Sequence, residues 1–153
     1  MERFRRSFSF QGRTNRGRFW LTAIAIYGIL IASAFVSVGL SSLSPFFAIL
    51  FLPIVLAALV ASLANAVRRL HDRAKSGWWL FLFAGVPGVF LLPLQIMRNS
   101  ADPGAAGFAA LCALISLPFS IWALVEMGCL RGSVGANRFG DDPLRPPASE
   151  VFA

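Results

Sequence analysis

The sequence predicts an all-α membrane protein with four transmembrane helices. Hydrophobic residues make up 57% of its 153 residues and charged residues only 14%, a balance typical of polytopic membrane proteins and not of soluble domains. The charges also gather in a few short segments, which separate long uncharged stretches. A membrane β-barrel would instead show segments of about ten residues with alternating polarity, which this sequence lacks. We therefore expect lipid to surround most of the chain.

The first two spans are expected in the uncharged stretch 19–67. A hydrocarbon core about 30 Å thick takes roughly 20 helical residues, so this stretch is long enough for two helices. A turn must separate them, and serines followed by Pro45 provide it, because serine forms local hydrogen bonds and proline interrupts a helix. We place the first span at 19–40 and the second at 46–67.

The last two spans follow a charged segment. An apolar stretch that begins with two tryptophans predicts the third span at 78–97, and after a short loop the fourth span is expected at 105–130. Residues 1–143 would then form a single four-helix membrane domain. The tail at 144–153 contains prolines and polar residues, so we expect it to be disordered.

The distribution of basic residues predicts that both termini are cytoplasmic. With four spans, the N-terminal segment, the loop between the second and third spans and the C-terminal tail lie on one side of the membrane. Of the 14 Lys and Arg residues, only Arg98 lies on the other side. The positive-inside rule assigns the basic side to the cytoplasm. This orientation and attraction to an anionic leaflet explain the net charge of +7, and no basic polar face or binding fold indicates nucleic acid.

Three polar segments outside the spans hold the candidate functional residues, and all three are expected on the cytoplasmic side. The first, GRTNRGRFW, spaces Arg13, Arg16 and Phe19 three residues apart, so that they would share one face of a helix. Its simplest interpretation is an orientation signal with an aromatic residue at the membrane interface. A binding site for lipid headgroups is the alternative.

The second segment, RRLHDRAKSGWW, directly follows the second span. If the helix continues past the interface, Asp72 can reach Arg68 and Arg69. One carboxylate among four cations is expected to orient the arginines and not to act as a base. His71 and Asp72 point about 100° apart on a helix, which makes them a poor catalytic pair. Trp78 would mark the headgroup level at the start of the third span.

The third segment, GSVGANRFGDDP, follows the fourth span. Its glycines and Asn137 permit a left-handed backbone, which favours an ordered loop. It lacks the Gly-Lys-Ser/Thr ending and the preceding strand of a nucleotide-binding loop.

In this order, the three segments resemble the hallmarks of a bacterial inner-membrane family known only as domain of unknown function 805. The resemblance extends from about Phe8 to Pro143 and departs from the family pattern at Ala74, where glycine is expected. It implies a small four-helix protein of the bacterial inner membrane, and it implies no established reaction.

Glu126 is the ionisable residue expected inside a span, where a proton relay or a cation ligand is one interpretation. It lies only about 7 Å of helical rise from Arg131, so we favour a structural pair with the basic cluster. We expect no cofactor and no metal site. The chain has one histidine, and Cys112 and Cys129 do not have the spacing of metal ligands.

Three classes of function remain open. We expect a non-enzymatic membrane module whose cytoplasmic collar of Arg, Asp and Trp side chains binds anionic lipid headgroups, a membrane protein partner or a second copy of the chain. A small transporter or channel subunit is an alternative, although the spans offer few polar residues for a path. The other alternative is a membrane enzyme that acts on a lipid phosphate, with His71 and Asp72, Asn137 or Asp142 brought together from different loops.

The most specific expectation is that the three segments close into one headgroup site. Guanidinium groups match phosphate oxygens bidentately, so arginines would contact the phosphate while Asp72 and Asn137 hold them in place. No catalytic residue is assigned. The candidate binding residues are Arg13, Arg16, Arg68, Arg69, His71, Asp72, Trp78 and Asn137.

Overall fold

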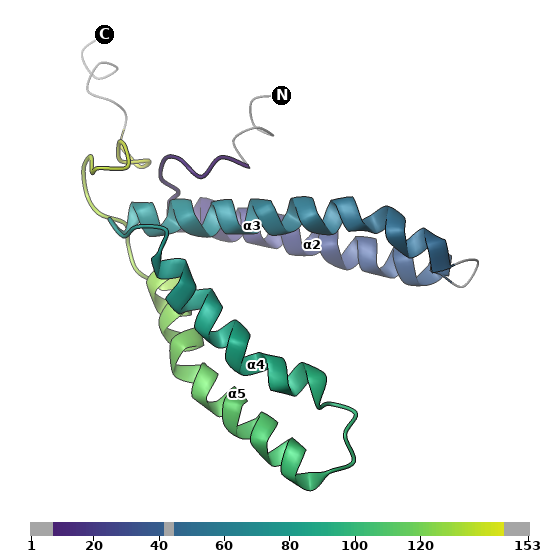
Figure 1. Ribbon diagram of the computed structural model, residues 1–153. Coiled ribbons are helices and arrows are strands. Elements are labelled where there is room, and N and C mark those ends of the chain that lie inside the picture. The colour runs from purple at the N-terminus through teal and green to yellow at the C-terminus, as the bar shows by residue number, and fades with distance from the viewer. Residues whose placement is uncertain (1–7, 42–44, 146–153) are drawn as a thin grey trace.

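The computed structural model describes residues 8–41 and 45–145, and this part of the chain is all helical, with no strand. Two helical hairpins diverge from a common end (Figure 1). The first pairs α2 (Arg16–Ser41) with α3 (Leu52–Asp72), which follows the short 3-10 helix η1 (Pro45–Phe51). The second pairs α4 (Val86–Ile96), preceded by the π-helix η2 (Phe81–Gly85), with α5 (Pro103–Ala123), which continues into the π-helix η3 (Leu124–Cys129).

Within the described residues, three helices are long and apolar enough, by length and composition, to cross a membrane, at Arg16–Leu40, Ile49–Asp72 and Pro103–Cys129. The fourth apolar helix, Phe81–Ile96, is shorter than the span expected at 78–97. The residues just before it, Trp79 and Leu80, are also helical, and the amide of Leu80 donates to the carbonyl of Gly77 at 3.0 Å in the turn that leads into the helix. The prediction of an all-helical chain is confirmed. Part of the turn expected before Pro45, and the tail beyond residue 145, lie outside the described residues.

Local sequence explains where the helices of the second hairpin begin and change pitch. The Asp102 carboxylate caps the first turn of α5 by accepting from the amides of Gly104 and Ala105, and Pro103 occupies a position that needs no amide donor. Pro87 likewise cannot donate to the preceding turn, and the backbone there widens to the π-helix η2. Both features are encoded within a few residues of where they act.

Small residues bring the two helices of the first hairpin together. Ala58 and Ala61 of α3 are buried against Ile26 of α2, the close packing that apolar helices use where no hydrophobic effect drives them together. A second buried cluster lies at the common end, where Leu70 of α3 packs against Phe83 and residues of the second hairpin. Leu70 is fully buried. The hairpins are therefore joined at this end.

The turn after α3 holds Ala74 in a left-handed conformation, with φ of 57°. This conformation costs an L-residue roughly 1–2 kcal/mol, and glycine would remove that cost. Glycine also raises the conformational entropy of the unfolded chain, which offsets part of the gain. Ala74→Gly should therefore raise the free energy of unfolding by about 0.5–1 kcal/mol. Equilibrium unfolding in mild detergent measures this. Ala136→Gly, at an exposed loop alanine without a positive φ, is the control and should not stabilise the protein. Equal effects of the two changes would contradict the assignment.

Candidate functional site

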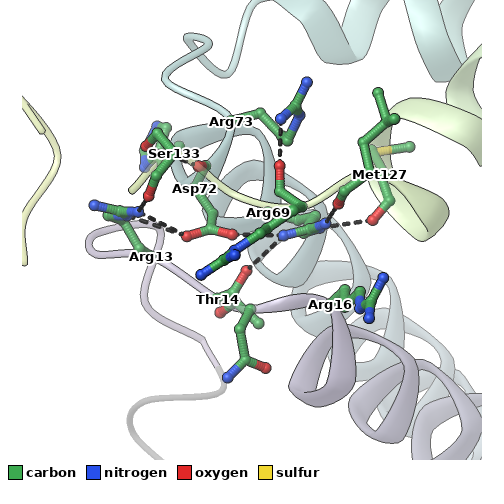
Figure 2. Close-up of polar contacts among 12 residues, drawn as sticks. Arg13, Thr14, Arg16, Arg69, Asp72, Arg73, Met127 and Ser133 are labelled. Carbon is green, nitrogen blue, oxygen red and sulfur yellow. Dashed lines mark hydrogen bonds and ion pairs between the residues drawn. The ribbon is translucent and has the colours of Figure 1, made fainter. Parts of the chain in front are cut away.

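The three polar segments come together at the common end of the two hairpins. Figure 2 shows Arg13 and Thr14 from the segment before α2, Arg69 and Asp72 from the end of α3, and Ser133 from the loop after η3 in one cluster. The sequence predicted one side of the membrane for all of them. The structure brings them into direct contact.

The carboxylate of Asp72 lies between two arginines. Its Oδ1 accepts from Nε and Nη2 of Arg13 at 3.1 and 3.0 Å, and its Oδ2 accepts from Nη1 of Arg69 at 2.5 Å. The side chains of Arg13, Asp72 and Arg69 are 1%, 3% and 0% exposed. We call these three residues the clamp. Such a buried group is stable only while each charge keeps its partners.

The remaining donors of the two arginines bind backbone carbonyls. Arg69 donates through Nε to Met127 at 2.6 Å and through Nη2 to Leu130, which ties α3 to the end of η3. Arg13 donates to the carbonyls of Ser133 and Gly135, both at 2.6 Å, which ties the N-terminal segment to the C-terminal loop. Both guanidinium groups are therefore held by internal acceptors.

Several of these contacts are made to backbone carbonyls in the last turn of η3. The carbonyls in the last turn of a helix have no partner within the helix, so other groups must donate to those that are buried. The carbonyl of Met127 accepts from Arg69, that of Gly128 accepts from Trp20 Nε1 at 3.1 Å, and that of Cys129 accepts from Arg16 at 3.4 Å. Cations also interact favourably with a helix C-terminus. Side chains of the first hairpin thus complete the last helix of the second.

The end of α3 is completed in the same way. The carbonyl of Asp72 accepts from the amide and the hydroxyl of Ser133 at 2.7 and 3.1 Å. The carbonyl of His71 accepts from Nδ2 of Asn137 at 3.0 Å, and that of Arg68 accepts from the amide of Thr14 at 3.2 Å. Asn137 therefore contacts backbone, and it connects the C-terminal loop to α3.

The groups considered for catalysis have structural partners. The His71 ring stacks on Phe139 with 3.9 Å between centroids, and its Nδ1 lies 3.2 Å from the carbonyl oxygen of Gly12. The Asp142 carboxylate accepts from the amides of Leu144 and Gly135, and these hydrogen bonds hold the pKa of Asp142 below its ordinary value. Of the residues considered for catalysis, Asn137 contacts the backbone carbonyl of His71, and Asp142 contacts amides of its own loop. Each of them holds a loop or a helix end in place.

Glu126 belongs to a second ion-pair group beside the clamp. Its Oε1 accepts from Nε of Arg73 at 3.1 Å and lies 3.7 Å from Nζ of Lys75, and its side chain is 8% exposed. Arg131, the nearest cation along the chain, contributes its backbone carbonyl to Arg73 instead. The intramembrane acidic residue is therefore paired with the loop between α3 and η2.

Three further candidate residues lie outside the clamp. Trp78 is 76% exposed and lines a cavity of about 630 Å³ on the surface between α3 and η2. Arg16 is exposed beside the end of η3. Arg68, also a candidate, donates from Nε to the carbonyl of Ala64 at 3.3 Å. Across residues 8–41 and 45–145, no three His, Cys, Asp or Glu side chains group in a way that could hold a metal ion.

Two glycines at the site could not be identified from the sequence. A Cβ atom at Gly132 would lie 2.0 Å from Oδ2 of Asp72, and one at Gly128 would lie 2.7 Å from the Trp20 ring. Glycine after a helix is ordinarily interpreted as a helix end. The need for glycine here comes from side chains that lie far away in the sequence, so no local signal reveals it.

Comparisons with known proteins cover nearly the whole chain. The model of the family described as protein of unknown function (DUF805) matches residues 7–141, a range that contains the first two polar segments and the third as far as Asp141. Inner membrane protein YhaI of Escherichia coli (strain K12) is 30% identical over 137 residues, which cover 88% of this chain and 85% of that protein. The uncharacterized protein YiiR of the same strain is 26% identical over 137 residues, with 88% and 86% covered. No solved structure matches.

Proposed function

The chain belongs to the DUF805 family of membrane proteins, and from this premise we propose that it is a non-enzymatic module of the inner membrane whose cytoplasmic end binds anionic lipid headgroups. The observation that carries the proposal is that the basic residues at the common end of the hairpins fall into two groups, one buried and one exposed. The clamp arginines serve the fold, and other arginines remain on the surface around them.

The surface at this end combines exposed cations with interfacial aromatic rings. The exposed arginines that support the proposal are Arg16, Arg131, Arg138 and Arg145. Each basic residue near an anionic leaflet contributes about 1 kcal/mol of attraction. Trp20 and Trp78 are 41% and 76% exposed, and tryptophan is favoured at the headgroup level. A basic surface framed by such rings suits a membrane interface that carries negative charge.

The state of the polar groups favours a binding module over an enzyme. A general base or nucleophile needs an oriented side chain that can reach a substrate. The Asp72 carboxylate accepts from two buried arginines. The side-chain amide of Asn137 donates to the carbonyl of His71 and to the hydroxyl of Ser133. These contacts assign both residues to the scaffold on which the basic surface is built.

The proposal requires the basic end to face the cytoplasm, which cysteine labelling in intact cells tests. In a background with Cys112 and Cys129 changed to alanine, Ser100→Cys places a thiol in the loop between α4 and α5 and Ala136→Cys places one in the C-terminal loop. An impermeant thiol reagent should label position 100 in intact cells and should label position 136 only after permeabilisation. Labelling of position 136 in intact cells would show that the basic end faces away from the cytoplasm, and this result would contradict the proposal.

Headgroup binding itself is tested by native mass spectrometry of the protein in mild detergent. The protein is mixed with equal amounts of phosphatidylglycerol and phosphatidylethanolamine that carry identical acyl chains. We expect adducts with phosphatidylglycerol in clear excess, because its net charge complements the basic surface. Equal adducts of the two lipids would refute the proposal. Conversion of either lipid to a product of different mass would support a membrane enzyme instead.

A further inference from the structure

We infer that the anionic lipid of the proposed function occupies one defined groove, which lies between the two hairpins directly beneath the clamp. Its phosphate would contact Arg16, and one of its acyl chains would lie along α2 from Trp20 towards Tyr27. The inference rests on the proposed function and goes further, because it names the place and assigns the acyl chain a part in recognition.

The groove has the size and the chemistry of a lipid site. Its volume is about 400 Å³, within the range of about 300–1,000 Å³ that is common for small-molecule sites. The first hairpin lines it with Trp20, Ala23 and Tyr27 of α2 and with Leu63 of α3, and the second hairpin lines it with residues that include Met127. In this inference the acyl chain enters between the two hairpins, which diverge from the common end (Figure 1).

Arg16 lies at the polar edge of this groove. The indole of Trp20, which lines the groove, donates to the carbonyl of Gly128, which also lines it. One helical turn earlier on α2, Arg16 donates to the carbonyl of Cys129, the next residue of η3. Arg16 is exposed, and the Cys129 carbonyl takes one of the five N–H donors of its guanidinium group. The other donors suit a phosphate in a bidentate contact.

The arrangement fits an anionic phospholipid better than a second copy of the chain. A groove with a cation at one end and an apolar floor complements a molecule with an anion at one end and an apolar chain at the other. From Arg16 to Tyr27 the helix rises about 16 Å, which is close to one leaflet of a hydrocarbon core about 30 Å thick. A neighbouring helix would bury its apolar face here and leave Arg16 without an anionic partner.

Two matched pairs of variants test the inference by native mass spectrometry with long-chain phosphatidylglycerol. Arg16→Ala and Arg18→Ala each remove one exposed positive charge from the first turn of α2, but Arg18 lies two residues on and about 200° around the helix. Loss of one charge-assisted contact should weaken phosphatidylglycerol retention about tenfold in Arg16→Ala, and Arg18→Ala should stay within about twofold of the wild type.

The second pair of variants tests the place of the acyl chain. Ala23→Phe fills the groove, whereas Ala25→Phe adds the same ring to α2 outside it. Only the former should reduce retention.

The melting temperature of each variant in detergent shows whether it folds. A competition experiment on the wild type tests the groove without any variant. Dihexanoyl phosphatidylglycerol has the same headgroup but chains too short to fill the groove, so it should compete weakly with the long-chain lipid. Equal losses in Arg16→Ala and Arg18→Ala, or equal competition by the short-chain lipid, would overturn the groove while leaving headgroup binding intact. A wild type without any preference for phosphatidylglycerol would instead refute the proposed function.

Discussion

Asp72→Ala is expected to lower the free energy of unfolding by about 3–5 kcal/mol, because it leaves Arg13 and Arg69 buried without their shared counter-ion. The two guanidinium groups contact the same carboxylate from opposite sides, and all three side chains are at most 3% exposed. Asp72→Asn keeps an oxygen acceptor but loses the negative charge, so it should cost less than Asp72→Ala. Equilibrium unfolding in mild detergent measures all of these values.

Asp141→Ala serves as the control for this prediction. Asp141 is an exposed aspartate in the C-terminal loop, and exposed substitutions of this kind usually change the unfolding free energy by less than about 0.5 kcal/mol. The comparison removes the general effect of losing one negative charge from a basic protein. If Asp72→Ala and Asp141→Ala unfold alike, Asp72 does not have the role that the clamp assigns to it.

Gly132→Ala should have the second largest effect, a loss of about 3 kcal/mol in the free energy of unfolding. The added Cβ atom would lie 2.0 Å from Oδ2 and 2.5 Å from Cγ of Asp72. Ordinarily a flexible side chain could move aside. Here both oxygens of Asp72 are held by buried arginines, so relief of the clash must break part of the clamp.

The control is Gly107→Ala in α5, where an added Cβ meets no atom within 4 Å. In a helix interior this change should be neutral or stabilise by up to about 1 kcal/mol, since alanine favours the helix. The same unfolding experiment separates the two glycines. A Gly132→Ala protein as stable as the wild type would show that the Asp72 carboxylate is free to move.

The helices could be predicted from the sequence because a long apolar stretch is a signal within one segment of the chain. The same holds for the pair of Asp72 with Arg69, which is set by helical spacing. The contact of Arg13 with Asp72 and that of Arg69 with Met127 join segments 59 and 58 residues apart, and no local pattern encodes them. The sequence showed that the polar segments share one side, and it could not show that their side chains meet.

The role of the arginines was the part that sequence reasoning could least anticipate. A cluster of arginines at a membrane surface suggests phosphate contacts, and Arg13 and Arg69 were expected to make them. In the structure Arg13 donates to carbonyls of the C-terminal loop and Arg69 donates to carbonyls at the end of η3, and both pair with Asp72. Arg16 stays at the surface, and this difference between arginines of one segment depends on tertiary contacts.

One departure from the family pattern could be interpreted only with the structure. Ala74 stands where glycine is expected, and the backbone at that position has the left-handed conformation that glycine tolerates best. The family pattern therefore reports a backbone requirement of the turn after α3. The change to alanine adds strain to that turn and removes no hydrogen-bonding side chain from the clamp.

The clamp joins the N-terminal segment to α3 through Arg13 and Asp72, and a double-mutant cycle between these two residues measures that connection. Unfolding in detergent is measured for Arg13→Gln, Asp72→Asn and the double variant, with Arg18→Gln in place of Arg13→Gln as the matched control. We expect a coupling energy of about 1.5–3 kcal/mol for Arg13 with Asp72, and a value near zero for Arg18 with Asp72. A coupling energy for Arg13 with Asp72 that equals the Arg18 control would contradict this expectation.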